Sequence, residues 1–423
     1  MADWYSTPAA SALGVRYPMI QGPFGGGQSS PELTAAISNL GGLGSYGART
    51  LYPKEIREVV ADIRRRTSSP FAVNLWLSVE DQGASDVTRE QFEAALAPLL
   101  PLYREFDVEP PAYARTSPPR VADQIEALIE LCVPAFSFIF GVPDRKVLAE
   151  CQRRSIVTIG AATTAGEATA LEAAGVDVVV ASGFEAGGHR PSFLRSSDSS
   201  LTGLFALVPQ VVDAVGIPVI AAGGIADGRT VAAALMLGAS GVQVGTAFLA
   251  CEESNAAPGH RAALLNASRE DTVLTRAFSG RLARGLRNRL ADCLESIPRV
   301  LPYPVASELR SPSSRSAVAR PHRDDAAVCG PGSATSPSPS SERCIRGTCV
   351  GDRCHAAGTR MSDARRCRRQ LMGARLAKLC PRLCTHARSS NTNCVRPLNV
   401  VRSLTAILFS CRAIDFINTT APD

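Results

Sequence analysis

This chain of 423 residues lacks long apolar runs and an export signal, and it has few cysteines before residue 290. No apolar run approaches the ~20 residues that a membrane-spanning helix needs, so we expect no membrane association. The first ten residues, MADWYSTPAA, have neither the basic start nor the apolar stretch of an export signal, and we expect a cytoplasmic protein. Only Cys132, Cys151 and Cys251 precede residue 290, which suits a reducing compartment and argues against a disulfide-stabilised fold.

Charge and cysteine divide the chain into two parts. Residues 1–310 have a net charge of −5 and residues 311–423 a net charge of +11. The second part is rich in Ser, Pro, Arg and Cys and shows no sustained apolar period, so we expect a disordered tail. Its cysteines lack the two-residue spacing of zinc sites, and its arginines lack interleaved aromatic residues. We therefore expect no metal site and no nucleic-acid partner.

Eight short apolar runs alternate with helical patterns before residue 250. Runs of Val, Ile and Ala without polar alternation are typical of parallel strands that are covered on both faces. Strict alternation with helices implies right-handed crossovers, and eight such units close into a (β/α)8 TIM barrel. An open doubly wound sheet is the alternative, but the glycine-terminated strands do not cluster at one switch point. We expect strands at residues 17–22, 43–47, 71–77, 135–141, 156–162, 176–183, 217–224 and 241–248.

The fold class is therefore α/β, with three regions along the chain. Residues 1–250 are expected to form the cofactor-binding barrel, residues 251–310 a small cap or closing segment, and residues 311–423 the basic tail. Residues 78–120 interrupt the alternation as a polar insertion that contains a helix. Ser29 or Ser30 is expected to cap the helix that follows the first strand, because Pro31 suits the first turn.

Two glycine turns follow the last two strands of the predicted barrel, at Gly223-Gly224 and at Gly245-Thr246. Glycine lets backbone N–H groups approach a ligand closely, and paired turns of this kind hold a phosphate at the top of such barrels. The alternative is that both are packing turns. We expect a phosphate-bearing cofactor at this pair of turns, bound without a lysine.

His189 follows the sixth strand, at the barrel face that carries the chemistry. A histidine can accept a proton near neutral pH, so His189 is the candidate catalytic base, although it could instead be a structural histidine in a loop. Arg190 is a weaker candidate for contact with an anionic ligand. Asn74 is the single polar residue of an apolar strand and must find hydrogen bonds, either from the protein or from a ligand ring.

At these residues the chain resembles the nitronate monooxygenases, formerly called 2-nitropropane dioxygenases, which are FMN-dependent (β/α)8 barrels. The resemblance extends from about residue 17 to about residue 304. It rests on the following segments: IQGPFGGGQSSPEL, AISNLGGLGSYGA, FAVNLWL, ASGFEAGGHR, VIAAGGIADGRTVAAALMLGA and VQVGTAFLACEES.

The resemblance implies FMN as cofactor and alkyl nitronates, or nitroalkanes, as substrates that dioxygen oxidises to a carbonyl compound and nitrite. His189 would remove the acidic α-proton of a nitroalkane or contact the nitronate. Flavin reductases that use NAD(P)H on enoyl thioesters or quinones look similar, so that reaction is the alternative. The expected cofactor contacts are Gly223, Gly224, Gly245 and Thr246 at the phosphate and Gln21, Gly22, Pro23, Asn74, Ser182 and Gly183 at the ring, together with Gly188 and Gln243.

The resemblance ends near Leu301–Pro304, where family members continue with further helices. The chain continues with the Ser-, Pro-, Arg- and Cys-rich tail instead. This abrupt change favours the hypothesis that the reading frame changes near residues 305–315. The oligomeric state is not predicted.

Overall fold

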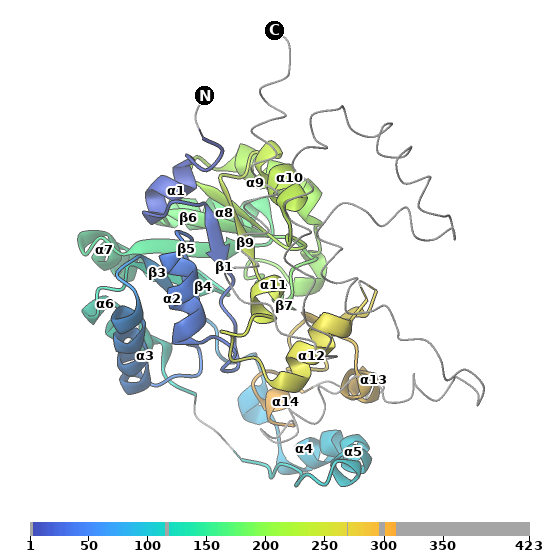
Figure 1. The fold of residues 1–423 in the computed structure, drawn as a ribbon. Coiled ribbons are helices and arrows are strands. Elements are labelled where there is room, and N and C mark those ends of the chain that lie inside the picture. The colour runs from blue at the N-terminus through green and yellow to red at the C-terminus, as the bar shows by residue number, and fades with distance from the viewer. Residues whose placement is uncertain (1–2, 115–117, 269, 296–300, 310–423) are drawn as a thin grey trace, which may run out of the picture. The chain divides into compact units, whose positions relative to one another are not determined.

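Eight parallel strands form the central sheet of the computed structural model, which describes residues 3–114, 118–268, 270–295 and 301–309. The strand order is β1-β9-β8-β6-β5-β4-β3-β2, and helices connect the strands (Figure 1). The strands are β1 (Met19–Gln21), β2 (Gly44–Gly47), β3 (Phe71–Trp76), β4 (Ala135–Ile139), β5 (Val157–Ala162), β6 (Val178–Ser182), β8 (Val219–Ala222) and β9 (Gly241–Val244).

The two ends of this sheet meet, which closes the barrel. Ile20 and Leu43 form a parallel bridge just before β2. The backbone N–H of Gln21 donates to the carbonyl of Leu43 at 2.9 Å, and the N–H of Leu43 donates to the carbonyl of Met19 at 2.8 Å. The closed ring of strands confirms the predicted (β/α)8 barrel and excludes the open doubly wound sheet.

The barrel interior is filled by small and branched apolar side chains, as in other closed barrels. Ala9 and Leu13 of the short helix α1 (Pro8–Leu13) belong to the same buried cluster as the inner strand residues. These inner residues are Ile20, Leu43, Ala72, Ala135, Ile159, Ala161, Val178, Val180, Ile220 and Ala222.

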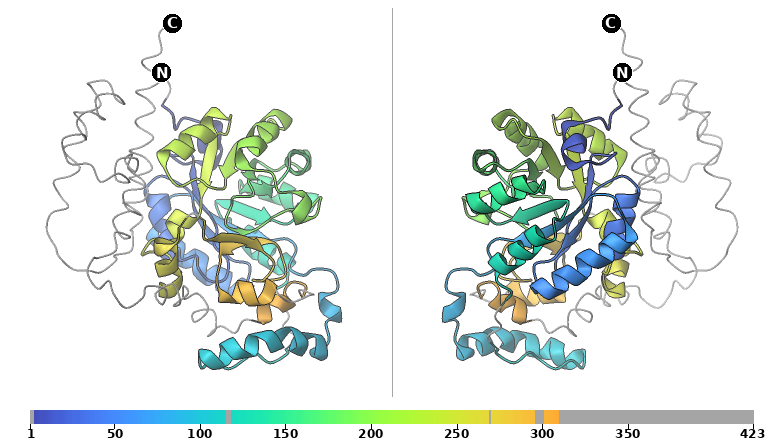
Figure 2. Two further views of the ribbon diagram at one scale, coloured as in Figure 1. Left: turned by 90° about the vertical axis from the view of Figure 1, so that its right-hand side faces the viewer. Right: turned by 90° about the vertical axis from the view of Figure 1, so that its left-hand side faces the viewer.

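Helices surround the strands on the outside (Figure 2). Ser30 caps α2, since its hydroxyl accepts a hydrogen bond from the N–H of Leu33 at 2.9 Å and Pro31 occupies the first turn. The sequence predicted this start, with Ser29 as the other candidate. The outer helices are α2 (Pro31–Asn39), α3 (Pro53–Arg66), α6 (Val121–Glu130), α7 (Arg145–Arg153), α8 (Ala165–Ala174), α9 (Leu204–Ala214) and α10 (Gly228–Met236).

The predicted eighth strand, 241–248, is too long. β9 ends at Val244, and the one-turn helix α11 (Thr246–Leu249) follows at once. Gly245 leaves the extended conformation with φ −105° and ψ −85°, and its carbonyl accepts the N–H of Phe248 at 2.9 Å. Thr and Phe are good strand formers, so composition alone did not reveal this boundary.

The insertion after β3 packs against the last described part of the chain. Its elements are η1 (Ala84–Asp86), α4 (Arg89–Leu96), η2 (Ala97–Leu99) and α5 (Leu100–Glu105), which confirms a helix in this insertion. Phe92 and Leu99 share a buried cluster with Leu290 of α13 (Arg289–Glu295) and Ala306 of α14 (Val305–Glu308).

A second, antiparallel sheet has the order β10-β11-β7. It joins β10 (Thr272–Thr275) and β11 (Ala283–Leu286) to the two-residue strand β7 (Gly188–His189). The remaining short elements are η3 (Ser197–Ser199) and α12 (Pro258–Asn266). The predicted boundaries at residues 250 and 310 stay predictions, and the tail at 311–423 lies outside the described residues. No helix in the described part of the chain is long and apolar enough to cross a membrane.

Candidate active site

Polar side chains occupy the inner face of the barrel above its apolar layer. Asn74 follows the inner residue Ala72 by two positions in β3, so it faces inward too. Its Nδ2 donates to the hydroxyl of Ser137, its register partner in β4, at 3.0 Å, and both side chains are buried. Gln243 lies opposite the inner residues Ile20 and Ala222, which places it on the same face. The protein therefore supplies one hydrogen-bond partner for Asn74, which is one of the two sources that the sequence left open.

Gln21 and Ser45 lie where β1 meets β2. The Gln21 side chain is fully buried; its Oε1 accepts the backbone N–H of Ser45 at 3.0 Å, and its Nε2 donates to the carbonyl of Gly22. The side-chain amide of Gln21 thus adds a hydrogen bond between β1 and β2, where the barrel closes. The hydroxyl of Ser45 is buried and has no hydrogen-bond partner in the described structure. Burying a hydroxyl without a partner costs about 1–3 kcal/mol, which makes Ser45 a candidate ligand contact.

The predicted glycine turns lie beside the loops that follow β1 and β6. A Cβ atom on Gly22 would lie 3.3 Å from the Cα of Gly245, so the ends of β1 and β9 approach closely. Pro23, half-buried, is the next residue along the chain. A Cβ on Gly187 would lie 3.6 Å from the hydroxyl of Thr246, which brings the β6 loop to the β9 turn.

Gly223 and Gly224 adopt left-handed backbone conformations, with φ of +125° and +66°. A Cβ on Gly223 would lie 3.1 Å from the backbone nitrogen of Ala186, in the loop after β6. A side chain at either position would be strained, so the turn after β8 depends on glycine. The turns after β8 and β9 therefore both border residues 183–188, and the phosphate contact at these turns stays a prediction.

Ser182, Gly183 and Arg190 shape the same loop. Ser182 ends β6 and is buried. A Cβ on Gly183 would lie only 2.7 Å from the Cβ of Leu204, so Gly183 also permits α9 to pack here. The guanidinium of Arg190 donates to the carbonyls of Ser182, at 2.6 Å, and Ser200, and its burial lowers the arginine pKa to about 10. These contacts favour a loop-stabilising role for Arg190 over contact with an anion.

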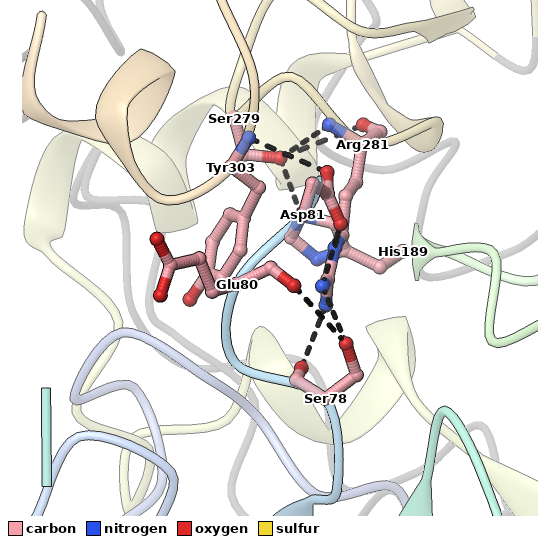
Figure 3. Close-up of polar contacts among 7 residues, drawn as sticks. All are labelled: Ser78, Glu80, Asp81, His189, Ser279, Arg281 and Tyr303. Carbon is pink, nitrogen blue, oxygen red and sulfur yellow. Dashed lines mark hydrogen bonds and ion pairs between the residues drawn. The ribbon is translucent and has the colours of Figure 1, made fainter. Parts of the chain in front are cut away.

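His189 is held by the second sheet. It pairs with Ala283 of β11, while Gly188, with φ +83°, lies opposite Arg284. The Nε2 atom of His189 is 2.7 Å from the hydroxyl of Ser279 (Figure 3). Its ring meets the indole of Trp76 edge-on, with centroids 4.8 Å apart. Because Trp76 follows Asn74 by two positions in β3, His189 lies above the inner face of the barrel.

Two arginines and a tyrosine complete the surroundings of Trp76. The guanidinium of Arg49 lies 4.6 Å from the Trp76 ring and 4.9 Å from the Tyr303 ring. The guanidinium of Arg281 lies 4.4 Å from the Tyr303 ring and 5.8 Å from Trp76. The Tyr303 hydroxyl is buried with no hydrogen-bond partner among the described residues, and burial raises the Tyr303 pKa. The result is an aromatic site bordered by two guanidinium groups, of which that of Arg281 is paired with Asp81.

The structure thus brings most of the predicted residues to one end of the barrel. It also adds residues that sequence reasoning missed. Two of them had a usable signal: period-two alternation from Asn74 places Trp76 on the inner face, and Ser137 is the polar residue of the apolar run AFSFIFG. No local pattern marks the others. The added residues are Ser45, Arg49, Trp76, Asp81, Ser137, Ser279, Arg281 and Tyr303.

A closed barrel with glycine turns and a held histidine at the carboxyl ends of its strands has the layout of a (β/α)8-barrel enzyme. A family model described as "Nitronate monooxygenase" matches residues 6–338. A protein of Staphylococcus aureus (strain Newman) named "Probable nitronate monooxygenase" is 40% identical over 310 residues, which cover 73% of this chain and 86% of the relative. A relative of the same name in Staphylococcus haemolyticus (strain JCSC1435) is 38% identical over 324 residues, or 76% and 89% of the two chains.

Two solved structures are similar to this chain in sequence and in fold. Nitroalkane oxidase from Streptomyces ansochromogenes is 36% identical, with a TM-score of 0.66 over 74% of this chain and 88% of that one. FabK from Thermotoga maritima is 31% identical, with a TM-score of 0.52 over 68% and 76%. The chain belongs to the nitronate monooxygenase family, and it is an oxidoreductase.

Proposed function

We propose that this protein uses FMN to oxidise alkyl nitronates with dioxygen, giving a carbonyl compound and nitrite. The observation that carries the proposal is the position of His189, fixed by Ser279 and Trp76 above the polar inner face of the barrel. Family membership supports a flavin-dependent oxidation of nitroalkanes.

The residues at the barrel mouth fit a flavin. The turns at Gly223-Gly224 and Gly245-Thr246 can offer backbone N–H groups and a hydroxyl to its phosphate. Asn74 and the unpartnered hydroxyl of Ser45 can bind polar edges of its ring, and the family supports this cofactor. When bound, FMN supplies the redox chemistry, accepting an electron from the nitronate and passing it to dioxygen.

His189 would act on the proton. A nitroalkane has an acidic α-proton, and an imidazole held in one orientation can accept it at neutral pH. The Ser279 hydroxyl fixes the ring nitrogen Nε2, and Trp76 restricts the ring from one side. General bases of this kind typically contribute ~10²–10⁴-fold to the rate.

The charge of the site favours an anionic substrate. Arg49 places a guanidinium group against Trp76 and Tyr303, and Trp76 contacts His189, whereas the charge of Arg281 is paired with Asp81. A nitronate is the anion of a nitroalkane, so positive charge favours its binding over that of the neutral parent. The buried Tyr303 hydroxyl can donate a hydrogen bond to a nitronate oxygen.

An assay of the purified protein tests the proposal. The bound flavin is first released and identified by its spectrum and mass. Nitrite release is then measured in air with propionate-3-nitronate and with a simple alkyl nitronate, and NADH and NADPH turnover is measured with enoyl-thioester and quinone acceptors. FMN with nitrite release supports the proposal. FMN without nitrite, but with turnover of NADH or NADPH, supports the flavin reductase alternative, and a protein that binds no flavin contradicts both.

A further inference from the structure

We infer that Asp81 is a positioning residue for His189, acting from the insertion through Arg281 and Ser279. The inference rests on the proposed function in one respect: it takes His189 to be the catalytic base. The residues come from three distant segments, at 78–81, 279–281 and 303, and meet beside His189 (Figure 3).

The first step is the ion pair between Asp81 and Arg281. The Asp81 Oδ1 accepts a hydrogen bond from Arg281 Nε at 2.8 Å, and the ion pair also brings it within 2.7 Å of Nη2. The guanidinium also donates to the carbonyl of Ser78 at 2.9 Å and to its hydroxyl at 3.0 Å. The Arg281 side chain is only 9% exposed, whereas Asp81 is 34% exposed. A buried guanidinium needs its anionic partner, so Asp81 determines where Arg281 rests.

The second step is the link between Asp81 and Tyr303. The backbone N–H of Asp81 donates to the carbonyl of Tyr303 at 2.8 Å. In return, the Asp81 Oδ2 accepts the backbone N–H of Tyr303 at 3.3 Å. One carboxylate therefore holds both Arg281 and the segment that carries the Tyr303 ring.

The third step reaches His189. The backbone N–H of Arg281 donates to the Ser279 hydroxyl at 3.4 Å, and that hydroxyl contacts His189 Nε2 at 2.7 Å. On the other side, Trp76 contacts the guanidinium of Arg281 and the ring of His189. Displacing Arg281 would therefore disturb His189 through its hydrogen bond and its ring contact.

The test compares Asp81→Ala and Asp81→Asn with the wild-type protein. Asp81→Ala removes both carboxylate contacts, while Asp81→Asn keeps one carbonyl oxygen for Arg281. Glu105→Ala is the matched control, because Glu105 makes a bidentate pair with Arg289, at 2.6 and 2.7 Å, between α5 and α13. That pair joins two helices, whereas His189 and Ser279 belong to the second sheet and the loop between β10 and β11.

Two readouts are needed, one independent of activity. Carbon-13 NMR of labelled histidine locates the His189 ring signals, which are identified by their loss in His189→Asn and which sense the nearby Trp76 ring. We expect these signals to move toward the position of a solvent-exposed histidine in Asp81→Ala, less in Asp81→Asn, and not at all in Glu105→Ala. We expect kcat for nitrite release from a neutral nitroalkane, whose α-proton His189 must remove, to fall in the same order, by roughly 10–100-fold for Asp81→Ala, with little change in KM.

Unchanged ring signals and unchanged kcat in both Asp81 variants would overturn the inference. An equal loss in Glu105→Ala would also overturn it, because the effect would then be general loosening of the insertion. If Asp81→Ala does not fold, Asp81→Asn decides by the same criteria. If the wild-type protein does not oxidise nitronates, the proposed function fails, and the NMR comparison still decides whether Asp81 positions the ring.

Discussion

Replacing Ser279 with alanine removes one hydroxyl and tests how His189 is oriented. The hydroxyl is buried and lies 2.7 Å from His189 Nε2, while its contacts to the backbone of Arg281 are longer, at 3.4 and 3.5 Å. Its loss should cost about 1 kcal/mol of stability, the net value of one hydrogen bond. The ring would lose its fixed orientation, and we expect kcat with a neutral nitroalkane, whose α-proton His189 must remove, to fall by roughly 10–100-fold.

The assay is nitrite release with a saturating neutral nitroalkane, together with urea unfolding. Ser254→Ala is the control, because the Ser254 hydroxyl is also buried and donates to the carbonyl of Leu249 at 2.6 Å, a contact that does not involve His189. The control should lose similar stability and keep its kcat. A kcat within about twofold of wild type in Ser279→Ala would refute the orienting role, since a misplaced catalytic group costs far more.

Two further predictions concern stability: one tests the packing of the barrel and the other its dependence on pH. In Gly44→Ala the new Cβ would lie 1.9 Å from the carbonyl oxygen of Thr34, so we expect a loss of about 3 kcal/mol or more in urea unfolding. Gly25→Ala, which meets nothing within 4 Å, should stay within about 0.5 kcal/mol, and equal losses would contradict the packing argument. Burial lowers the pKa of His260 below its usual 6.5, so the folded protein binds this proton less readily than the unfolded chain. Stability should therefore fall as the pH drops through 6.5, and His260→Gln should lose less between pH 7 and 5; an identical loss would refute this assignment.

Much of the barrel could be predicted from the sequence, because each strand and helix carries a local pattern. Runs such as FAVNLWL mark a strand covered on both faces, and Ser30 with Pro31 marks a helix start. The boundary at Gly245 was missed because it depends on one backbone conformation, which the identity of the flanking residues does not determine.

The candidate site was only partly predictable. The glycine turns and His189 follow strands directly, so sequence position placed them at the right end of the barrel. Ser279 reaches His189 because β11 pairs with β7, and Tyr303 packs against Trp76, which contacts His189. Such contacts join segments that are 90 residues or more apart in the sequence, and no periodicity or spacing reveals them. Gln21 was expected near the flavin ring, and that contact stays a prediction; its side chain accepts the backbone N–H of Ser45 where the barrel closes.

The most direct test of the proposed function compares nitrite release by the wild-type protein, His189→Asn and His260→Asn. Each protein is first shown to carry the same amount of flavin, so that any difference lies in the chemistry. We predict nitrite release by the wild type and by His260→Asn with a simple nitroalkane, and a loss of ~10²-fold or more in His189→Asn. Equal nitrite release by all three flavin-loaded proteins would contradict the assignment of His189 as the base.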